Sequence, residues 1–272
     1  MTTPSFGLVI VGDEILSGKR QDKHLPKVIE MLSARGLALS WARYVGDDRA
    51  RITATLRDAF AGGDIVFCCG GIGATPDDHT RQCAAAALGV PLELHPEAKR
   101  LIQQRMQDLA REQGQPYEPD RPDNVHRLNM GVFPQGADII PNPYNRIPGF
   151  SVGDVHFVPG FPVMAHPMIE GLLDGRYARL HGSAALTELS VLVFGAMEAA
   201  LTPLMEGIEA AHPGIKVFSL PSVDHPVHGR HIELGVKGRG DAVAVAYAAL
   251  RAGLIQSGAE LGPEMVRNGG TA

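Results

Sequence analysis

A glycine-rich segment followed by two aspartates is the part of this 272-residue sequence that most clearly suggests chemistry. Gly70, Gly71 and Gly73 precede the pair Asp77 and Asp78. Glycines let backbone amides turn towards an anion, and the start of a following helix favours the same charge. Two carboxylates beside such a loop would repel a phosphate unless a cation lay between them, and Mg²⁺ commonly binds one or two carboxylates together with phosphate oxygens. The segment therefore suggests a phosphate loop with a metal ion.

The same residues also have a purely structural interpretation. Pro76 suits the first turn of a helix, and Thr75 with Asp78 resembles a capping box in which Asp replaces Glu. In that case the acids only complement the helix dipole. The residues alone favour neither interpretation, and both remain open.

Two other turns carry residues suited to ligand binding. Gly12, Asp13 and Glu14 follow the first apolar run, and Ser17 comes three residues later. The two acids could bind a metal or ribose hydroxyls, and the serine a phosphate; the alternative is an ordinary solvated turn. The segment 158–162, Val-Pro-Gly-Phe-Pro, is on its own only a stiff turn before a helix.

A sheet must position these turns, and the chain up to about residue 179 has the pattern of one. Apolar runs at 6–11, 37–45 and 65–69 alternate with helical patterns, which is typical of an α/β domain with a mostly parallel sheet. Ligands of such sheets bind beyond the carboxyl ends of the strands, where these turns would lie. Apolar spacing predicts helices near 25–32, 52–60, 84–88, 98–110 and 163–173.

The pattern changes after residue 182. Strands are expected at 186–194, 215–220 and 230–237, with helices at 197–211 and 241–257, which gives a small α+β unit of the split βαβ type, in the order β-α-β-β-α. We therefore predict a first domain over 1–180, a second over 183–260, and a flexible tail over 261–272.

Composition narrows the function classes. The formal net charge of −5 offers no basic excess for holding a polyanion, so we expect no nucleic-acid partner. The sequence contains no apolar stretch of membrane-spanning length and no secretory signal, so we expect no membrane partner and a cytoplasmic location. Cys68 and Cys69 lie in an apolar run and are interpreted as small buried hydrophobes.

A group of three histidines invites a metal-site interpretation. His225, His228 and His231 lie within seven residues. On a strand His228 would point away from the other two, and Pro226 and Gly229 indicate a turn. A solvated hairpin turn is the favoured interpretation.

Taken in order, three segments resemble a known family. They are G-D-E-I-L-S-G, G-G-I-G-A-T-P-D-D-H-T-R, and P-N-P-Y-N-R-I-P-G-F with V-P-G-F-P. Over about residues 5–175 they are similar to the Mog/MoaB-type molybdopterin-binding domain, in the form found in competence/damage-inducible protein A (CinA). The second unit resembles the small middle domain of CinA chains. The resemblance implies an αβα sandwich with a pocket above the strand ends. CinA chains commonly continue into a nicotinamide-nucleotide deamidase domain, for which we expect no room here.

The resemblance also implies roles for the matching positions. Catalysis would fall to Asp78 and Asp13, and a divalent metal, Mg²⁺ or else Mn²⁺ or Co²⁺, to Asp78, Asp77 and Asp13. Substrate binding would involve the two turns, the glycine loop and the closing loop, through Gly12, Glu14, Ser17, Gly70, Gly71, Gly73, Thr75, Pro159 and Gly160.

The activity implied is metal-dependent hydrolysis of a dinucleotide pyrophosphate such as ADP-ribose, by a homo-oligomer, dimer or trimer. One alternative is a non-catalytic module that binds molybdopterin or a nucleotide, and another is adenylyl transfer to molybdopterin. The first alternative is favoured where the sequence departs from the family: Ala74 replaces a proline, Phe161 replaces a small residue, and basic residues replace asparagines near 19–24.

Overall fold

The computed structural model describes residues 5–182 and 186–268. The chain divides into two compact units: the first includes everything up to Leu180 except Leu32–Leu37, and the second includes Leu32–Leu37 and the chain from His181 onwards. The first unit contains a six-stranded sheet and the second a four-stranded sheet. Among the described residues, no helix combines the length and the apolar character needed to cross a bilayer. Each unit is described separately below.

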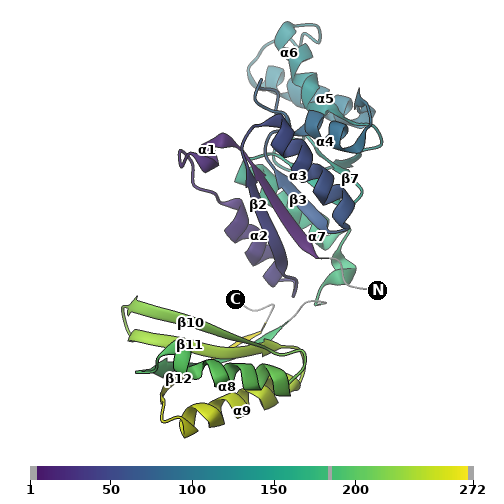
Figure 1. Ribbon diagram of the computed structural model, residues 1–272. Helices are drawn as coiled ribbons and strands as arrows, with labels where there is room; N and C mark the ends of the chain where they lie inside the picture. The colour runs from purple at the N-terminus through teal and green to yellow at the C-terminus, as the bar shows by residue number, and fades with distance from the viewer. Residues whose placement is uncertain (1–4, 183–185, 269–272) are drawn as a thin grey trace. The chain divides into compact units, whose positions relative to one another are not determined.

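The first unit is built on a mostly parallel sheet, as predicted (Figure 1). Its strand order is β2-β1-β3-β8-β7-β6, in which the first four strands run parallel and the last two are antiparallel to their neighbours. Their bounds are β1 Phe6–Val11, β2 Leu39–Val45, β3 Ile65–Cys69, β6 Asp138–Ile140, β7 Gly149–Val152 and β8 Val155–Val158. A separate pair is formed by β4 Leu92–Leu94 and β5 Val132–Pro134.

Helices connect these strands at the predicted places. Their bounds are α1 Asp13–Leu16, α2 His24–Ser33, α3 Arg49–Gly62, α4 Thr80–Leu88, α5 Pro96–Glu112, α6 Pro122–Arg127 and α7 Pro162–Asp174, with short 3₁₀ turns at Leu128–Gly131 and Ala178–Leu180. Helix α3 starts where the side chain of Asp48 accepts from the amide of Arg51. Helices α1 and α6 are not among the five helices that apolar spacing predicts.

The central strands are covered on both faces. Every residue of β1, β3 and β8 is buried. One face packs against α3 and α4 in a core that includes the stacked rings of Phe133, Phe150 and Phe157, whose centroids lie 4.6 and 4.4 Å apart. Cys68 and Cys69 are free and buried, as expected, and burial raises the pKa of the Cys68 thiol to about 12.

A buried hydrogen-bonded chain ties β8 to the end of the first unit. The His156 Nδ1 lies 2.7 Å from the hydroxyl of Ser151, and its Nε2 lies 2.5 Å from the hydroxyl of Tyr177. Tyr177 donates in turn to Asp154 at 2.8 Å, so the His156 Nε2–H donates to Tyr177 and Nδ1 accepts from Ser151. Burial, assisted by Arg176, lowers the pKa of His156 to about 3.

This histidine should make stability depend on pH. Because the unfolded chain binds a proton at His156 near pH 6.5 and the folded chain only near pH 3, stability is lost as pH falls through that window. The slope due to this residue is about 1.4 kcal/mol per pH unit. Urea unfolding of the first unit between pH 7.5 and 4.5 should show a shallower pH dependence in His156→Gln than in the wild type. The control Gln115→Asn, at an exposed position with no titratable group, should keep the wild-type slope, and equal slopes in all three proteins would contradict this role.

The second unit adds one strand to the predicted order. Its elements are β9 Thr187–Phe194, α8 Glu198–Ala211, β10 Lys216–His225, β11 Gly229–Gly238, α9 Ala242–Gln256 and β12 Glu260–Asn268. The antiparallel sheet has the order β10-β11-β9-β12, the arrangement of a split βαβ sandwich. Its core joins β9 and β11 to α8 and α9.

The prediction of a flexible tail over 261–272 is wrong for the residues that the structure describes. Residues up to Asn268 form β12, which pairs with β9. Leu261 of β12 packs against the core of the second unit. Strand β12 therefore covers apolar surface that a flexible tail would leave exposed. Gly262 and Pro263 interrupt the strand pattern, and the pairing register shifts between Leu261 and Glu264. Residues 269–272 lie outside the described part.

Candidate functional site

The three turns singled out in the sequence meet at one pocket, called here the glycine-loop pocket. It lies at the carboxyl ends of β1, β3 and β8 and has a volume of about 560 Å³. Parallel strands bring their carboxyl ends to one edge, which is why segments far apart in the sequence converge. The predicted residues that line it are Gly12, Glu14, Gly70, Gly71, Gly73, Thr75, Asp77, Asp78, Pro159 and Gly160.

Two predicted residues lie outside that lining. Asp13 borders a neighbouring hollow on the β2 side, and Ser17 ends the one-turn helix α1 with an exposed side chain. Ser17 donates its amide to the carbonyl of Asp13 at 2.8 Å, which is the role of a turn residue. The structure therefore does not support a phosphate contact by Ser17.

The glycine loop leaves β3 with a backbone that only glycine adopts easily. Gly70 and Gly71 have φ values of 106° and 69°. A Cβ on Gly70 would lie 2.4 Å from the carbonyl oxygen of Val11, and one on Gly71 would lie 2.2 Å from the hydroxyl of Thr80. Buried Thr80 holds the loop, because its hydroxyl donates to the Gly70 carbonyl and its amide to the Gly71 carbonyl, both at 3.0 Å.

Of the two interpretations left open for Thr75 and Asp78, the cap of a helix does not hold. Helix α4 begins at Thr80, so Pro76 is not in its first turn. Thr75 and Asp78 instead close a turn on themselves: the Asp78 Oδ2 accepts from the Thr75 amide at 2.8 Å and from its hydroxyl at 2.5 Å. The Asp78 amide donates back to the Thr75 carbonyl at 3.0 Å. This turn presents Asp77 and Asp78 to the pocket rather than to a helix dipole.

An arginine that sequence reasoning did not single out supports this loop. Arg81 is only 4% exposed, and its guanidinium donates to the carbonyl of Gly73. Burial lowers the pKa of Arg81, while the nearby Asp78 carboxylate acts in the opposite direction. A charged residue directly after Thr80, in the first turn of an otherwise alanine-rich helix, was the signal that could have identified it.

Asp47, two residues after the end of β2, adds an acid that the sequence analysis did not single out. The Asp47 Oδ2 accepts from the Asp13 amide at 3.0 Å, and the Asp13 Oδ1 accepts from the Asp47 amide at 3.1 Å. Burial raises the pKa of Asp47, as do the negative charges of Asp13, Glu14 and Asp77. Acidic groups from three loops are therefore close enough for their negative charges to repel one another.

The carboxylates that line this pocket suit a cation that is also bound by oxygens of a ligand. Within the described part of the chain, no three His, Cys, Asp or Glu side chains are grouped closely enough to hold a metal by themselves. Mg²⁺ does not need such a cage, because one or two carboxylates with substrate phosphates suffice. The repulsion that raises the pKa of Asp47 is what a bound cation would relieve.

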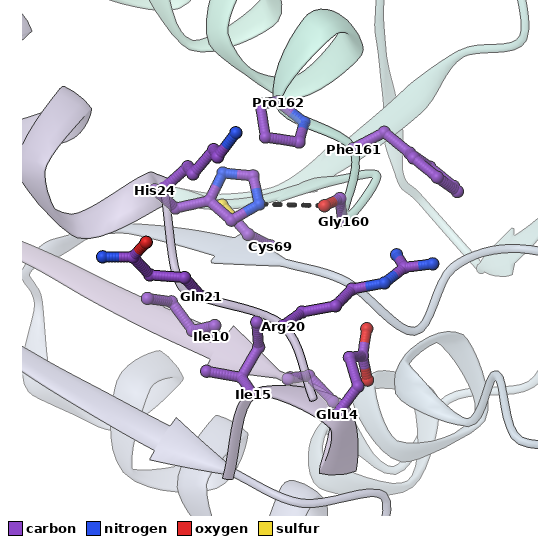
Figure 2. A pocket seen from close by; sticks show the side chains of 12 residues that line it. Ile10, Glu14, Ile15, Arg20, Gln21, His24, Cys69, Gly160, Phe161 and Pro162 are labelled. Carbon is purple, nitrogen blue, oxygen red and sulfur yellow. Dashed lines mark hydrogen bonds between the residues drawn. The ribbon is translucent and has the colours of Figure 1, made fainter. Parts of the chain in front are cut away.

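The closing loop is fixed by a histidine from α2. His24 is 4% exposed and donates from Nε2 to the carbonyl of Gly160 at 3.0 Å (Figure 2). The next residue, Phe161, is 54% exposed, with the guanidinium of Arg20 6.0 Å from the centre of its ring. The loop therefore keeps an aromatic side chain in the lining of the glycine-loop pocket.

The three histidines of the second unit form a hairpin turn, as the sequence favoured. The turn joins β10 to β11, and the Nδ1 of His225 accepts from the amides of Val227 and His228. His228 does not point away from the other two, as it would on a strand: its ring lies 5.0 Å from that of His225 and 6.0 Å from that of His231. The turn, rather than strand alternation, sets these directions. The described side chains include no metal-binding group there.

Comparisons with known proteins agree with this geometry. A family model described as a probable molybdopterin binding domain matches residues 7–179. A CinA-like protein of Anaeromyxobacter sp. (strain Fw109-5) is 31% identical over 255 residues, which cover 87% of this chain and 60% of that protein. A CinA-like protein of Anaeromyxobacter dehalogenans (strain 2CP-C) is 32% identical over 216 residues, covering 77% and 50%. The chain thus spans between 50% and 60% of the length of these relatives.

A solved structure is similar to the first unit. The protein CinA with unknown function from Thermoplasma acidophilum has a TM-score of 0.52 and 25% sequence identity. The similarity covers 62% of this chain and 97% of the other. The share of this chain that the similarity covers is comparable to the share that forms the first unit.

Proposed function

Because this chain belongs to the family of molybdopterin-binding domains, we propose that it binds a nucleotide or pterin phosphate together with a divalent cation and hydrolyses a dinucleotide pyrophosphate such as ADP-ribose. The observation that carries the proposal is the convergence of the glycine loop with acids from three turns around one pocket of about 560 Å³. A glycine loop suits phosphate oxygens, and the acids suit a cation that bridges to them.

Each part of the site has a role in this proposal. The backbone amides of Gly70, Gly71 and Gly73 bind phosphate oxygens. Asp77 and Asp78, together with phosphate oxygens of the ligand, hold the cation, Mg²⁺ or else Mn²⁺ or Co²⁺, which when bound supplies charge neutralisation at the phosphoryl group being transferred. Asp13, which borders the neighbouring hollow, positions Asp47 through the two hydrogen bonds between them. Thr75 orients the Asp78 carboxylate through its two hydrogen bonds.

The rest of the pocket suits the base of a nucleotide. The segment 142–148 is ordered by its own contacts: the Asn142 amide donates to the Asn145 side chain at 2.8 Å and to the Ile147 carbonyl at 2.9 Å. Asn142, Asn145, Ile147, Pro148, Met130 and Met164 line one part of the pocket. A rigid wall of apolar and amide groups is typical of a site for a planar heterocycle.

A non-catalytic binding module is the second candidate. One Asp78 oxygen already accepts a hydrogen bond from Thr75, which leaves fewer oxygens to bind a cation. The exposed ring of Phe161 also lines the pocket and reduces the space for an attacking water, so a ligand could bind without being hydrolysed. Adenylyl transfer to molybdopterin is the third candidate, since it would use the same phosphate and cation sites.

One experiment separates the three. The protein is incubated with ADP-ribose, with FAD, and with ATP plus molybdopterin, each with Mg²⁺, Mn²⁺ or Co²⁺, and the products are chromatographed. AMP from ADP-ribose is the expected result. Binding without product supports the module, and pyrophosphate release that needs molybdopterin supports adenylyl transfer. The absence of both binding and product would contradict all three.

A further inference from the structure

A second, smaller pocket adjoins the glycine-loop pocket and is called here the basic pocket. It has a volume of about 300 Å³, and Figure 2 shows residues that line it. Those lining only this pocket include Ile10, Ile15, Gln21, Lys23 and His24. The two pockets share Val11, Glu14, Arg20, Gly160 and Phe161, so they are neighbours across a common boundary. A ligand in one can therefore extend into the other.

The two pockets differ in charge. The glycine-loop pocket is lined by four carboxylates and one guanidinium: Glu14, Asp47, Asp77, Asp78 and Arg20. The basic pocket is lined by Arg20 and Lys23 against Glu14 alone. Neither cation forms an ion pair with another residue in the part of the chain that the structure describes. An anion can therefore bind here without an intervening metal.

Buried residues and hydrogen bonds hold the walls of the basic pocket in place. Its floor comes from β1 and β3, where Ile10 and Cys69 are buried. His24 binds the closing loop through Gly160, and Arg20 donates its amide to the Glu14 carbonyl at 2.9 Å. Figure 2 shows Arg20 extended between Glu14 and Phe161, on the boundary between the pockets. The charged groups thus approach a preformed hollow.

We propose that the basic pocket binds a phosphate carried on the part of the substrate beyond the pyrophosphate, so that the protein prefers nucleoside-diphosphate sugars with a distal phosphate. The inference rests on the proposed function, because it assumes that the pyrophosphate lies on the glycine loop. A volume of about 300 Å³ is at the lower end for small-molecule pockets and suits one phosphorylated sugar. Arg20 offers a planar fork of donors, Lys23 a point charge and Gln21 an amide, a set that matches phosphate oxygens.

The test compares two ligands that differ by one phosphate. Calorimetric titration with Mg²⁺ measures the Kd of ADP-ribose and of ADP-ribose 1″-phosphate. We expect the wild type to bind the second ligand about tenfold more tightly, as charge-assisted hydrogen bonds to one phosphate allow. Arg20→Gln with Lys23→Gln should reduce that ratio to about one. Lys19→Gln, which changes an exposed lysine of the same loop outside both pockets, should retain it.

Failure of this inference differs from failure of the proposed function. If ADP-ribose binds but the wild-type ratio is one, or if the double variant keeps the wild-type ratio while its melting temperature is unchanged, the basic pocket does not bind the distal phosphate. If the ratio behaves as expected but no AMP is released, hydrolysis is refuted and the basic pocket stands. If neither ligand binds, both are overturned. The single variant Lys23→Gln gives an intermediate ratio under the proposal, which guards against misfolding of the double variant.

Discussion

Replacing Asp78 by Asn should lower the rate of AMP release from ADP-ribose by about 10²–10³-fold, the usual cost of removing one group that stabilises charge in a transition state. The substitution removes the negative charge and keeps the shape of the side chain. The Asn carbonyl oxygen can still accept from the amide and hydroxyl of Thr75, so the turn should hold. The loss should therefore appear in turnover and not in folding.

The measurement pairs product chromatography with thermal unfolding. Asp224→Asn, at an exposed position in the second unit, is the matched control and should leave both values unchanged. Turnover in Asp78→Asn equal to the wild type would remove Asp78 from the catalytic role. A large fall in melting temperature would instead show that its main role is to close the turn with Thr75.

Replacing Gly70 by Ala should destabilise the first unit by at least about 2 kcal/mol and abolish ligand binding. The φ of 106° is strained for any residue with a side chain, and the added Cβ would lie 2.4 Å from the Val11 carbonyl oxygen. The neighbour is backbone of a central strand, so it cannot move aside cheaply. The loop would have to leave the edge of the sheet, taking its amides away from the phosphate.

Gly160 provides the matched control for Gly70. A Cβ there would meet the Cα of Gly70 at 3.4 Å, an ordinary contact, and its φ is not in the left-handed region. Gly160→Ala should change the free energy of unfolding by less than about 1 kcal/mol in urea titrations, as expected where nothing clashes. A Gly70→Ala protein as stable as Gly160→Ala would mean that the loop geometry described here is wrong.

Long apolar runs made the strands of the sheet predictable. The spacing of residues along the sequence did not reveal the hydrogen bonds that hold the glycine loop and its acids in place. Buried strands such as 65–69 have no polar residue, so their position and the edge where their turns meet follow from hydrophobicity. The residue types from Thr75 to Asp78 fit a capping box as well as they fit a turn. The helix begins only at Thr80, where the hydroxyl and amide of Thr80 donate to the carbonyls of Gly70 and Gly71.

Supporting residues came from long-range contacts that a sequence does not display. Asp47 became part of the site because β2 lies beside β1, and this placed its carboxylate against the Asp13 amide. His24 was noted only as a departure from the family, yet it binds Gly160, which is 136 residues away. Strand β12 was missed because Gly262 and Pro263 obscure its alternation, and its place is set by β9.

The most direct test of the central claim is the Mg²⁺ dependence of ADP-ribose binding to the wild-type protein. Because carboxylates surround the glycine loop, the pyrophosphate should be repelled without a cation. Calorimetric titration in Mg²⁺ should give measurable affinity, and the same titration in EDTA should weaken it about tenfold or more, since losing one favourable charge contact costs at least that much. Equal affinity in Mg²⁺ and in EDTA would contradict a site in which acids and glycine loop share a cation.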